Sequence, residues 1–307
     1  MEKIIDLKEV TWIHLMDPSH EEIEEIVQKY DVHDIIEEDI HSTNTQDKID
    51  VYDDYMFLVV NFPKYDRVQG KYFANEFNII LGKKFIVTIT NYDTNHIDTI
   101  KKQFQDDLED KERDEDYKLS PYYILYRVLD VMYDKTLNGL NKFVRDLHAL
   151  EDQLFQHERL NQKLLAWLLM KRRNSIFLKH LMLPQAEILQ ELHDATAKFY
   201  EGDLDVYFED LQYKMDKVMR AIETISENAS SLASTYNALA NIQTNEVISM
   251  LTIFTVMMGI FAVITGFYGM NIDLPGQEHP LMFAAILIAL LGIGWLLVLW
   301  ARRRGRF

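Results

Sequence analysis

Residues 247–271 read VISMLTIFTVMMGIFAVITGFYGMN, a long uncharged apolar run that ends in Tyr268-Gly269-Met270-Asn271. A short polar loop follows, and a second apolar run then extends from Leu281 to Trp300. Each run has about the 20 residues that a helix needs to cross a bilayer. The chain before residue 240 has the polar character of a water-facing domain. We therefore predict a large domain outside the bilayer that ends in a two-span membrane hairpin.

The charge and composition of the 307 residues exclude some classes of partner. The formal net charge is −17, whereas nucleic-acid binding needs a basic face, so no nucleic acid is expected as a partner. An acidic surface is compatible with attracting cations, but it also simply keeps a domain soluble. The lack of cysteine excludes thiolate metal sites and fits a reducing compartment. The first residues contain no apolar core of signal-peptide length, so the bulk is expected to stay in the cytoplasm.

Residues 1–118 have the pattern of a mixed α/β domain. Thr11–Leu15 is predicted as a strand, and Asp17-Pro18 then starts a helix with an apolar face formed by Ile23, Ile26 and Val27. A sheet of at least four strands is expected, because further runs rich in β-branched and aromatic residues follow. These runs are Tyr55–Phe62, Lys71–Leu81 and Phe85–Thr90.

Residues 119–202 are predicted to form long antiparallel helices, and residues 203–246 a stalk helix. Ser120-Pro121 is a good N-cap and first-turn pair for the first of these helices. Another helix spans roughly Asn161 to Tyr200 and bends at Pro184, which removes an intrahelical hydrogen bond. In the stalk, apolar residues recur in steps of four and three, the spacing of a heptad seam. The seam comprises Leu211, Met215, Val218, Ile222, Ile225, Ala229, Leu232, Tyr236 and Leu239.

The stalk helix is predicted to continue without a break into the first membrane span. No proline or glycine occurs between Asp203 and Met258. At 1.5 Å per residue, such a helix would be on the order of 100 Å long. A rod of this length needs partners. Earlier helices of the same subunit can supply all of them, or copies from several subunits can also bundle around one axis.

The C-terminal boundaries follow from the two apolar runs. We expect a transmembrane helix at 247–269, an extracellular loop at 270–280, a second transmembrane helix at 281–301 and a basic tail at 302–307. By the positive-inside rule, the arginines of the tail keep the C-terminus in the cytoplasm. With two spans, the N-terminal domain then lies there too. The expected localisation is the cell membrane, as a multi-pass protein with both termini cytoplasmic.

The first span carries small and polar residues along one helix face. On a helix otherwise made of Ile, Phe, Met and Val, such a stripe fits a close helix–helix contact in lipid. It also fits a pore lining, where small side chains leave room and Asn or Thr oxygens meet water or ions. A closed ring of copies would satisfy both interpretations. The stripe comprises Asn245, Ile248, Thr252, Thr255, Gly259, Ala262, Gly266 and Gly269.

The tetrad at the end of the first span resembles the signature of the CorA-type magnesium transporters. Gly269-Met270-Asn271 alone would be weak evidence of this family. Here, however, it ends a first span and precedes a polar loop, a last span and a basic tail. The resemblance extends over the whole chain. Other segments that look like this family are Trp12-Ile13-His14-Leu15, the Ser120-Pro121 helix opening, Arg172-Arg173 to Leu183-Pro184 and Thr244-Asn245-Glu246.

The resemblance implies a homopentameric funnel in which the first span of each subunit lines a central pore. Gly269, Met270 and Asn271 would then form the outer selectivity filter. Asn271 would contribute a ring of neutral oxygens, which suits Mg²⁺ because this ion holds its water shell tightly and is bound more easily through those waters. Gly269 would permit a tight backbone turn at the start of the loop.

The resemblance also assigns positions along the pore. Asn245 would form a polar ring near the cytoplasmic end, and Ile248 with Leu251 a hydrophobic constriction that can block conduction by dewetting. Thr252, Thr255 and Gly266 would line the pore as well. The sequence departs from the common pattern where many relatives have a bulky residue, a Pro and a Thr. This chain has Gly259, Ile260 and Ala262 there, which puts a direct transfer of ion selectivity in doubt.

Regulation in this family depends on Mg²⁺ bound by acidic residues between neighbouring cytoplasmic domains, so Mg²⁺ would be both transported and regulatory. Asp210 matches the family's acidic position on the stalk helix. Its metal-binding partner would follow the last strand, where Asp93 and Asp98 are both candidates. Taken singly, either of these two is more often a solvated surface carboxylate.

Two other functions remain open. Transport of Zn²⁺, Co²⁺ or Ni²⁺ is the main alternative, because the tetrad is shared within the family. The second is a membrane-anchored sensor without transport, which would give no reason for the polar stripe or for Asn271. No phosphate-binding glycine loop or nucleophile motif occurs, so neither an enzyme nor an ATP-driven pump is expected. The expected partners are further copies of the chain, membrane lipid and hydrated divalent cations, whose influx a negative cell interior favours.

Overall fold

The computed structural model describes most of the chain. The described residues are 2–7, 10–42, 46–92, 95–109, 120–156, 162–200, 202, 204–270 and 280–303. They form two compact units. The first unit comprises Met1–Gln153 and Lys163–Leu232, and the second comprises Leu154–Gln162 and Ala233–Phe307.

The first unit contains a six-stranded sheet in the order β1-β2-β6-β5-β4-β3. Strands β2 and β6 pair in parallel, and all other neighbouring strands are antiparallel. The prediction of at least four strands is confirmed, and the edge strands β1 and β3 are additions to it. The strands are β1 (Glu2–Leu7), β2 (Val10–Met16), β3 (Lys48–Val51), β4 (Tyr55–Asp66), β5 (Lys71–Gly82) and β6 (Phe85–Thr90).

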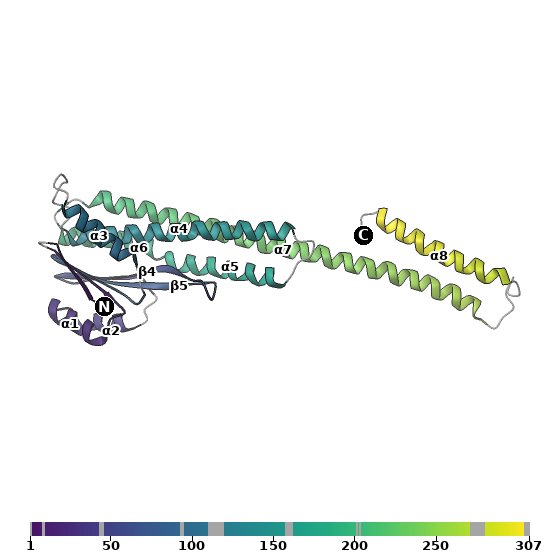
Figure 1. Ribbon diagram of the computed structural model, residues 1–307, viewed down its shortest axis with the longest axis horizontal. Coiled ribbons are helices and arrows are strands. Elements are labelled where there is room, and N and C mark those ends of the chain that lie inside the picture. Colours follow the sequence, from purple (N-terminus) through teal and green to yellow (C-terminus); the bar gives the residue numbers. More distant parts are fainter. Residues whose placement is uncertain are drawn as a thin grey trace. The chain divides into compact units, whose positions relative to one another are not determined.

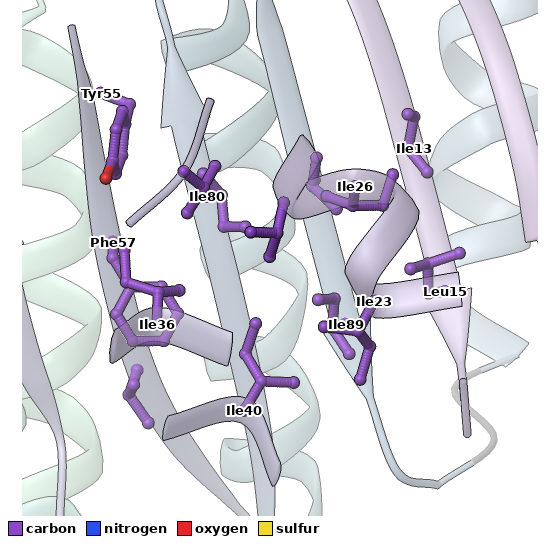
Figure 2. Close-up of a cluster of buried hydrophobic side chains, with 14 residues drawn as sticks. Ile13, Leu15, Ile23, Ile26, Ile36, Ile40, Tyr55, Phe57, Ile80 and Ile89 are labelled. Carbon is purple, nitrogen blue, oxygen red and sulfur yellow. The ribbon is translucent and has the colours of Figure 1, made fainter. Parts of the chain in front are cut away.

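Helices α1 (His20–Tyr30) and α2 (Asp34–His41) cover one face of this sheet (Figure 1). The predicted helix begins after Asp17-Pro18, at a capping box in which the Ser19 hydroxyl accepts from the Glu22 amide at 3.2 Å. The predicted apolar face of α1 is confirmed by its burial. Figure 2 shows the core between these helices and the sheet. Its members include Ile13, Leu15, Ile23, Ile26, Val27, Ile36, Ile40, Phe57, Ile80 and Ile89.

Long helices cover the opposite face (Figure 1). Side chains that alternate with the first core pack on them: Trp12 meets Phe104 of α3 (Asn95–Glu109), and Phe62 meets Tyr133 of α4 (Pro121–Gln156). The Ser120 hydroxyl accepts from the Tyr122 amide at 3.1 Å, which confirms the predicted start of α4.

The helix expected to bend at Pro184 is instead two helices, α5 (Gln162–Met182) and α6 (Gln185–Phe199). Proline breaks the hydrogen-bond ladder, and Gln185 then enters the core fully buried. Its amide donates to the Asn61 carbonyl at 2.5 Å and accepts from the Tyr133 hydroxyl at 3.0 Å. These bonds hold the start of α6 against β4, so the chain separates into two helices rather than bending.

Helix α7 (Asp205–Tyr268) is a single helix of 64 residues, as the lack of proline and glycine predicted. Its heptad seam is buried from Leu211 through Tyr236 and half-buried at Leu239. Helices of the same chain therefore cover most of the seam. In the second unit, α8 (Pro280–Arg303) turns back alongside the distal part of α7 (Figure 1).

Among the described residues, α7 is the one helix that is both long and apolar enough to cross a membrane. Its most apolar 18-residue window has a mean hydropathy of 2.5, and none of that window is buried. The described apolar part of α8, Ala284–Leu296, is shorter.

Candidate functional site

The distal part of α7 has two distinct faces. One face packs on α8, where Gly294 is buried close to Met257 and Phe261. A Cβ added to Gly294 would lie 3.3 Å from the Met257 sulfur and 3.8 Å from the Phe261 ring, so the small residue permits a close approach. The half-buried positions of α7 recur at helical spacing on this side. They are Ser249, Ile253, Met257, Ile260, Phe261, Ile264 and Tyr268.

The predicted stripe lies on the opposite face. At 3.6 residues per turn, its members are on the far side of the helix from Met257 and Phe261. All of them are exposed, including Ile248 at 55% and Leu251 at 62%. Contact with α8 therefore does not account for the stripe. The exposed positions are Asn245, Ile248, Leu251, Thr252, Thr255, Gly259, Ala262 and Gly266.

The threonine hydroxyls on this exposed face are hydrogen-bonded to the backbone of their own helix. The Thr252 hydroxyl donates to the Ile248 carbonyl at 2.8 Å, and the Thr255 hydroxyl donates to the Leu251 carbonyl at 2.8 Å. Because each hydroxyl hydrogen is used in the bond to a backbone carbonyl, the hydroxyl oxygen can act only as an acceptor toward other groups. Such oxygens suit an electropositive partner, either a cation or the hydrogens of its hydration water.

The inner end of the stripe borders a groove of about 550 Å³. Asn245 and Thr252 belong to its wall, and Glu246 adds the acidic group. Glu246 was not predicted as a pore residue, although an acidic residue beside a polar one at the start of an apolar run indicates such a position. The groove is lined by Ile242, Asn245, Glu246, Ile248, Ser249, Thr252 and Ile253.

The predicted filter lies only partly within the described chain. Helix α7 ends at Tyr268, the Gly269 amide donates to the Thr265 carbonyl at 2.9 Å, and Met270 is 48% exposed. A Cβ on Gly269 would lie 3.1 Å from the Thr265 oxygen, so close approach rather than a left-handed backbone favours glycine here. Asn271 lies outside the described residues.

Asp210 is half-buried near the start of α7 and bonds to α4. The Tyr126 hydroxyl donates to Asp210 Oδ2 at 3.1 Å. Burial, together with the carboxylates of Asp130 and Asp210, raises the pKa of Tyr126, so the phenol remains a donor. Asp98 is exposed in the first turn of α3, and Asp93 lies outside the described residues. In the part of the chain that is described, no three acidic or histidine side chains are grouped to hold a metal.

Lys214, one turn beyond Asp210, forms ion pairs with two other carboxylates. The Lys214 ammonium contacts Asp130 Oδ1 and lies 3.0 Å from Asp134 Oδ1. Burial alone would lower the pKa of Lys214, but the hydrogen bonds that its ammonium donates to these two carboxylates raise it. Asp130 also accepts from Arg127 at 2.9 Å. Among the described residues, no cationic side chain pairs with Asp210, which suits this carboxylate to an external cation.

Comparison with known proteins extends these observations. The model of the family described as CorA-like Mg²⁺ transporter protein matches residues 8–303. The cobalt/magnesium transport protein CorA of Thermotoga maritima is 22% identical over 284 residues, which are 92% of this chain and 79% of the relative.

Solved structures show the same fold. The complete CorA magnesium transporter of Methanocaldococcus jannaschii superimposes with a TM-score of 0.79 at 19% identity, over 99% of this chain and 93% of that one. The full-length CmaX protein gives a TM-score of 0.72 at 18% identity, over 99% and 91% of the two chains. The α/β domain, the long helix and the family match over nearly the whole length lead to one conclusion: this chain belongs to the CorA-like Mg²⁺ transporter family, whose members are membrane proteins that transport metal ions.

Proposed function

We propose that the chain assembles as a homopentamer whose α7 helices surround a pore for the passive influx of divalent cations, with Mg²⁺ as the principal ion. One observation carries this proposal. The face of α7 from Asn245 to Gly266 combines polar oxygens with small side chains, is exposed, and lies opposite the face that packs on α8. A ring of copies would give this face a partner and surround an axis with acceptor oxygens.

The proposed pore has an order of stations along α7. Asn271 is the outer filter, followed inward by Gly266, Ala262 and Gly259 in a wide middle section. The constriction lies at Leu251 and Ile248. The inner mouth is at Asn245, beside the Glu246 carboxylate that lines the groove there. Neutral oxygens at both ends suit an ion that keeps its hydration shell.

The proposed topology places the first unit and the C-terminal arginines in the cytoplasm. Both α7 and α8 then cross the cell membrane, and the loop between them is extracellular. The membrane potential drives cation influx through such a pore without a further energy source.

Co²⁺ is the second candidate ion. The Thermotoga relative is named as a cobalt/magnesium transport protein, which favours testing both ions together. The departure at Gly259, Ile260 and Ala262 lies mid-span, where pore width and polarity affect selectivity.

A direct test measures influx into proteoliposomes that contain the purified full-length protein. Mg²⁺, Co²⁺, Ni²⁺ and Zn²⁺ are compared side by side at several internal Mg²⁺ concentrations. We expect Asn271→Ala to reduce divalent influx strongly or to alter the order of the ions. The matched control is Gln277→Ala, which removes an amide from the same loop. Unchanged influx in Asn271→Ala would show that Asn271 does not filter the ion.

We further propose that cytoplasmic Mg²⁺ bound at Asp210, with Asp93 or Asp98 of a neighbouring subunit, closes the pore. The half-buried Asp210 carboxylate, which bonds to a neutral phenol and to no described cationic side chain, supports this role. Asp210→Ala should therefore release influx from inhibition by internal Mg²⁺. Asp216→Ala, an exposed change on the same helix, is the control. Retained inhibition in Asp210→Ala would remove Asp210 from the sensor.

A further inference from the structure

Asp210 lies beside a cluster of tyrosines contributed by two helices. Tyr207 precedes it by one turn of α7, and Tyr123 and Tyr126 project from α4. The ring centroids are 4.8 Å apart for Tyr126 and Tyr207, 5.3 Å for Tyr123 and Tyr207, and 5.8 Å for Tyr123 and Tyr126. Of these rings, Tyr126 is the one with a described hydrogen bond to Asp210. Packing in this cluster therefore restricts the side-chain conformation of Tyr126 and, with it, the position of its hydroxyl.

The cluster is also fixed from a third helix. Phe104 of α3 is buried and meets the Tyr123 ring edge-on, with centroids 5.9 Å apart. Aromatic side chains have few rotatable bonds, and an edge-to-face contact restricts them further. Because α3, α4 and α7 all contribute, the hydroxyl of Tyr126 is held by packing and not only by its own hydrogen bond.

The charges around Asp210 are arranged unevenly. Asp130 and Asp134 share the Lys214 ammonium, and Asp130 also accepts from Arg127. Asp210 instead accepts a hydrogen bond from the neutral phenol of Tyr126. A lysine at this point would neutralise the carboxylate, whereas a phenol fixes one oxygen and leaves the charge in place. The hydrogen bond from Tyr126 therefore orients the Asp210 carboxylate without pairing it with a cationic side chain.

We propose that Tyr126 is the positioning residue of the regulatory cation site, because its hydroxyl holds Asp210 Oδ2 and leaves Oδ1 to meet a hydrated divalent cation. This inference rests on the proposed function, in which Asp210 binds cytoplasmic Mg²⁺, and it adds the group that sets the affinity. Outer groups that orient a metal-binding side chain typically change metal affinity about 10- to 100-fold when they are removed. A cation bound through its waters should respond at the lower end of this range.

The transport test compares Tyr126→Phe with Tyr123→Phe in the full-length protein in proteoliposomes. Both variants keep the ring and lose one hydroxyl, but only Tyr126 bonds to Asp210. For Tyr126→Phe, we expect the internal Mg²⁺ concentration that halves influx to rise about tenfold. For Tyr123→Phe, this concentration should not change. Coinciding inhibition curves for the wild type and Tyr126→Phe would overturn the proposal.

A binding test separates this inference from the proposed function. Mg²⁺ binding to the detergent-purified protein is measured by calorimetry for the wild type, Tyr126→Phe, Asp210→Asn and the double variant. If Asp210→Asn binds Mg²⁺ like the wild type, the assignment of the cation to Asp210 fails. If Asp210→Asn loses binding but Tyr126→Phe does not weaken it, only the role of Tyr126 fails.

The double variant also excludes a general structural effect. If the hydroxyl acts through the carboxylate, Tyr126→Phe should cause no further change in Mg²⁺ binding in the Asp210→Asn background. An equal additional loss in that background would mean that the hydroxyl acts elsewhere, and the proposal would be wrong.

Discussion

The two halves of α7 are parts of one helix but meet different surroundings. From Leu211 to Tyr236, an apolar seam is buried by helices of the same chain. From Asn245 to Gly266, one side meets α8, and the small and polar stripe on the other side is exposed. Continuous helical hydrogen bonding therefore does not imply one kind of environment. The proximal half is stabilised within the subunit, and the distal half carries a face that a single subunit leaves exposed.

The largest effect should come from shortening the same residue type in both halves. Ile222 is fully buried in the seam, and Ile248 is 55% exposed in the stripe. Ile222→Ala removes buried methyl groups and should lower the free energy of unfolding by about 3 kcal/mol. Ile248→Ala should change it by less than about 0.5 kcal/mol. Thermal unfolding of the detergent-purified protein, followed by circular dichroism, measures both.

The matched isoleucines also differ in their expected effect on transport. Ile248→Ala would widen the proposed constriction, so influx at high internal Mg²⁺ should increase, whereas Ile222→Ala should change influx only through the amount of folded protein. Equal losses of stability in both variants would contradict the difference between the two halves.

The pH dependence of stability should come from the first unit, through Asp47 just before β3. Burial raises the pKa of Asp47 to about 6, although hydrogen bonds from the Asn61 side chain and amide oppose the rise. Because the folded-state pKa is the higher one, stability is fully present below the unfolded pKa of 3.8 and is lost as the pH rises to about 6. The loss amounts to about 2–3 kcal/mol.

Asp47→Asn should remove this slope, because an amide oxygen still accepts from Asn61 but cannot ionise. At pH 7.5 the variant should be more stable than the wild type by about 2 kcal/mol. Urea unfolding between pH 4 and pH 7.5 tests this, with the exposed Asp54→Asn as control. A slope that persists in Asp47→Asn would locate the pH dependence in another group.

The sequence predicted the features that local periodicity encodes. The heptad seam, the strands β2, β4, β5 and β6, and the Ser120 cap all depend on residues that are close in the chain. The short edge strands β1 and β3 were missed because their partners, rather than their own residues, define them. The break at Pro184 was read as a bend because the contact of Gln185 with Asn61 joins residues 124 positions apart.

In the candidate site too, local spacing predicted some features, whereas contacts between residues distant in the chain were missed. Spacing was sufficient to place the stripe on one face of α7. It could not show that α8 packs on the opposite face, although Gly292-Ile293-Gly294 was a hint of close helix packing. The bond from Tyr126 to Asp210 spans 84 residues, and no local pattern indicates it.

The contact between α7 and α8 includes a close approach at Gly294, which is the one buried residue among the described residues of α8. Gly294→Val should push α8 away from Met257 and Phe261, since even a Cβ would lie 3.3 Å from the Met257 sulfur. A cost of about 1–2 kcal/mol is expected. Gly292→Val is the matched control, because a Cβ there meets nothing within 4 Å.

The chain has no cysteine, so spin labels can be placed at will to measure this displacement. Labels on cysteines introduced at the exposed Val263 and Ile288 report the separation of the two helices. The distance distribution should shift or broaden in Gly294→Val and stay unchanged in Gly292→Val. A shift of equal size in both variants would mean that α8 does not pack through Gly294.

The smallest expected effect distinguishes a pore face from any other exposed face of the distal half. The Thr255 and Thr265 hydroxyls each donate to the carbonyl four residues earlier at 2.8 Å. Thr255 belongs to the stripe, whereas Thr265 lies off its axis, one residue before Gly266. Replacing either by Val keeps the shape and the backbone hydrogen bonds, so stability should change by less than about 0.5 kcal/mol. Each variant loses its hydroxyl, and with it both the hydrogen bond to the carbonyl four residues earlier and the acceptor oxygen.

If that oxygen faces the permeating ion, Thr255→Val should lower Mg²⁺ influx about fivefold, the equivalent of one hydrogen bond, and Thr265→Val should not. Initial influx rates in proteoliposomes with equal amounts of protein measure the difference. An equal decrease of influx in both variants would mean that the stripe is not the face of α7 that lines the pore. No change in Thr255→Val would mean that the ion passes the middle of the span without contact to the hydroxyl oxygens. The outer filter and the inner mouth would then carry the recognition of the ion.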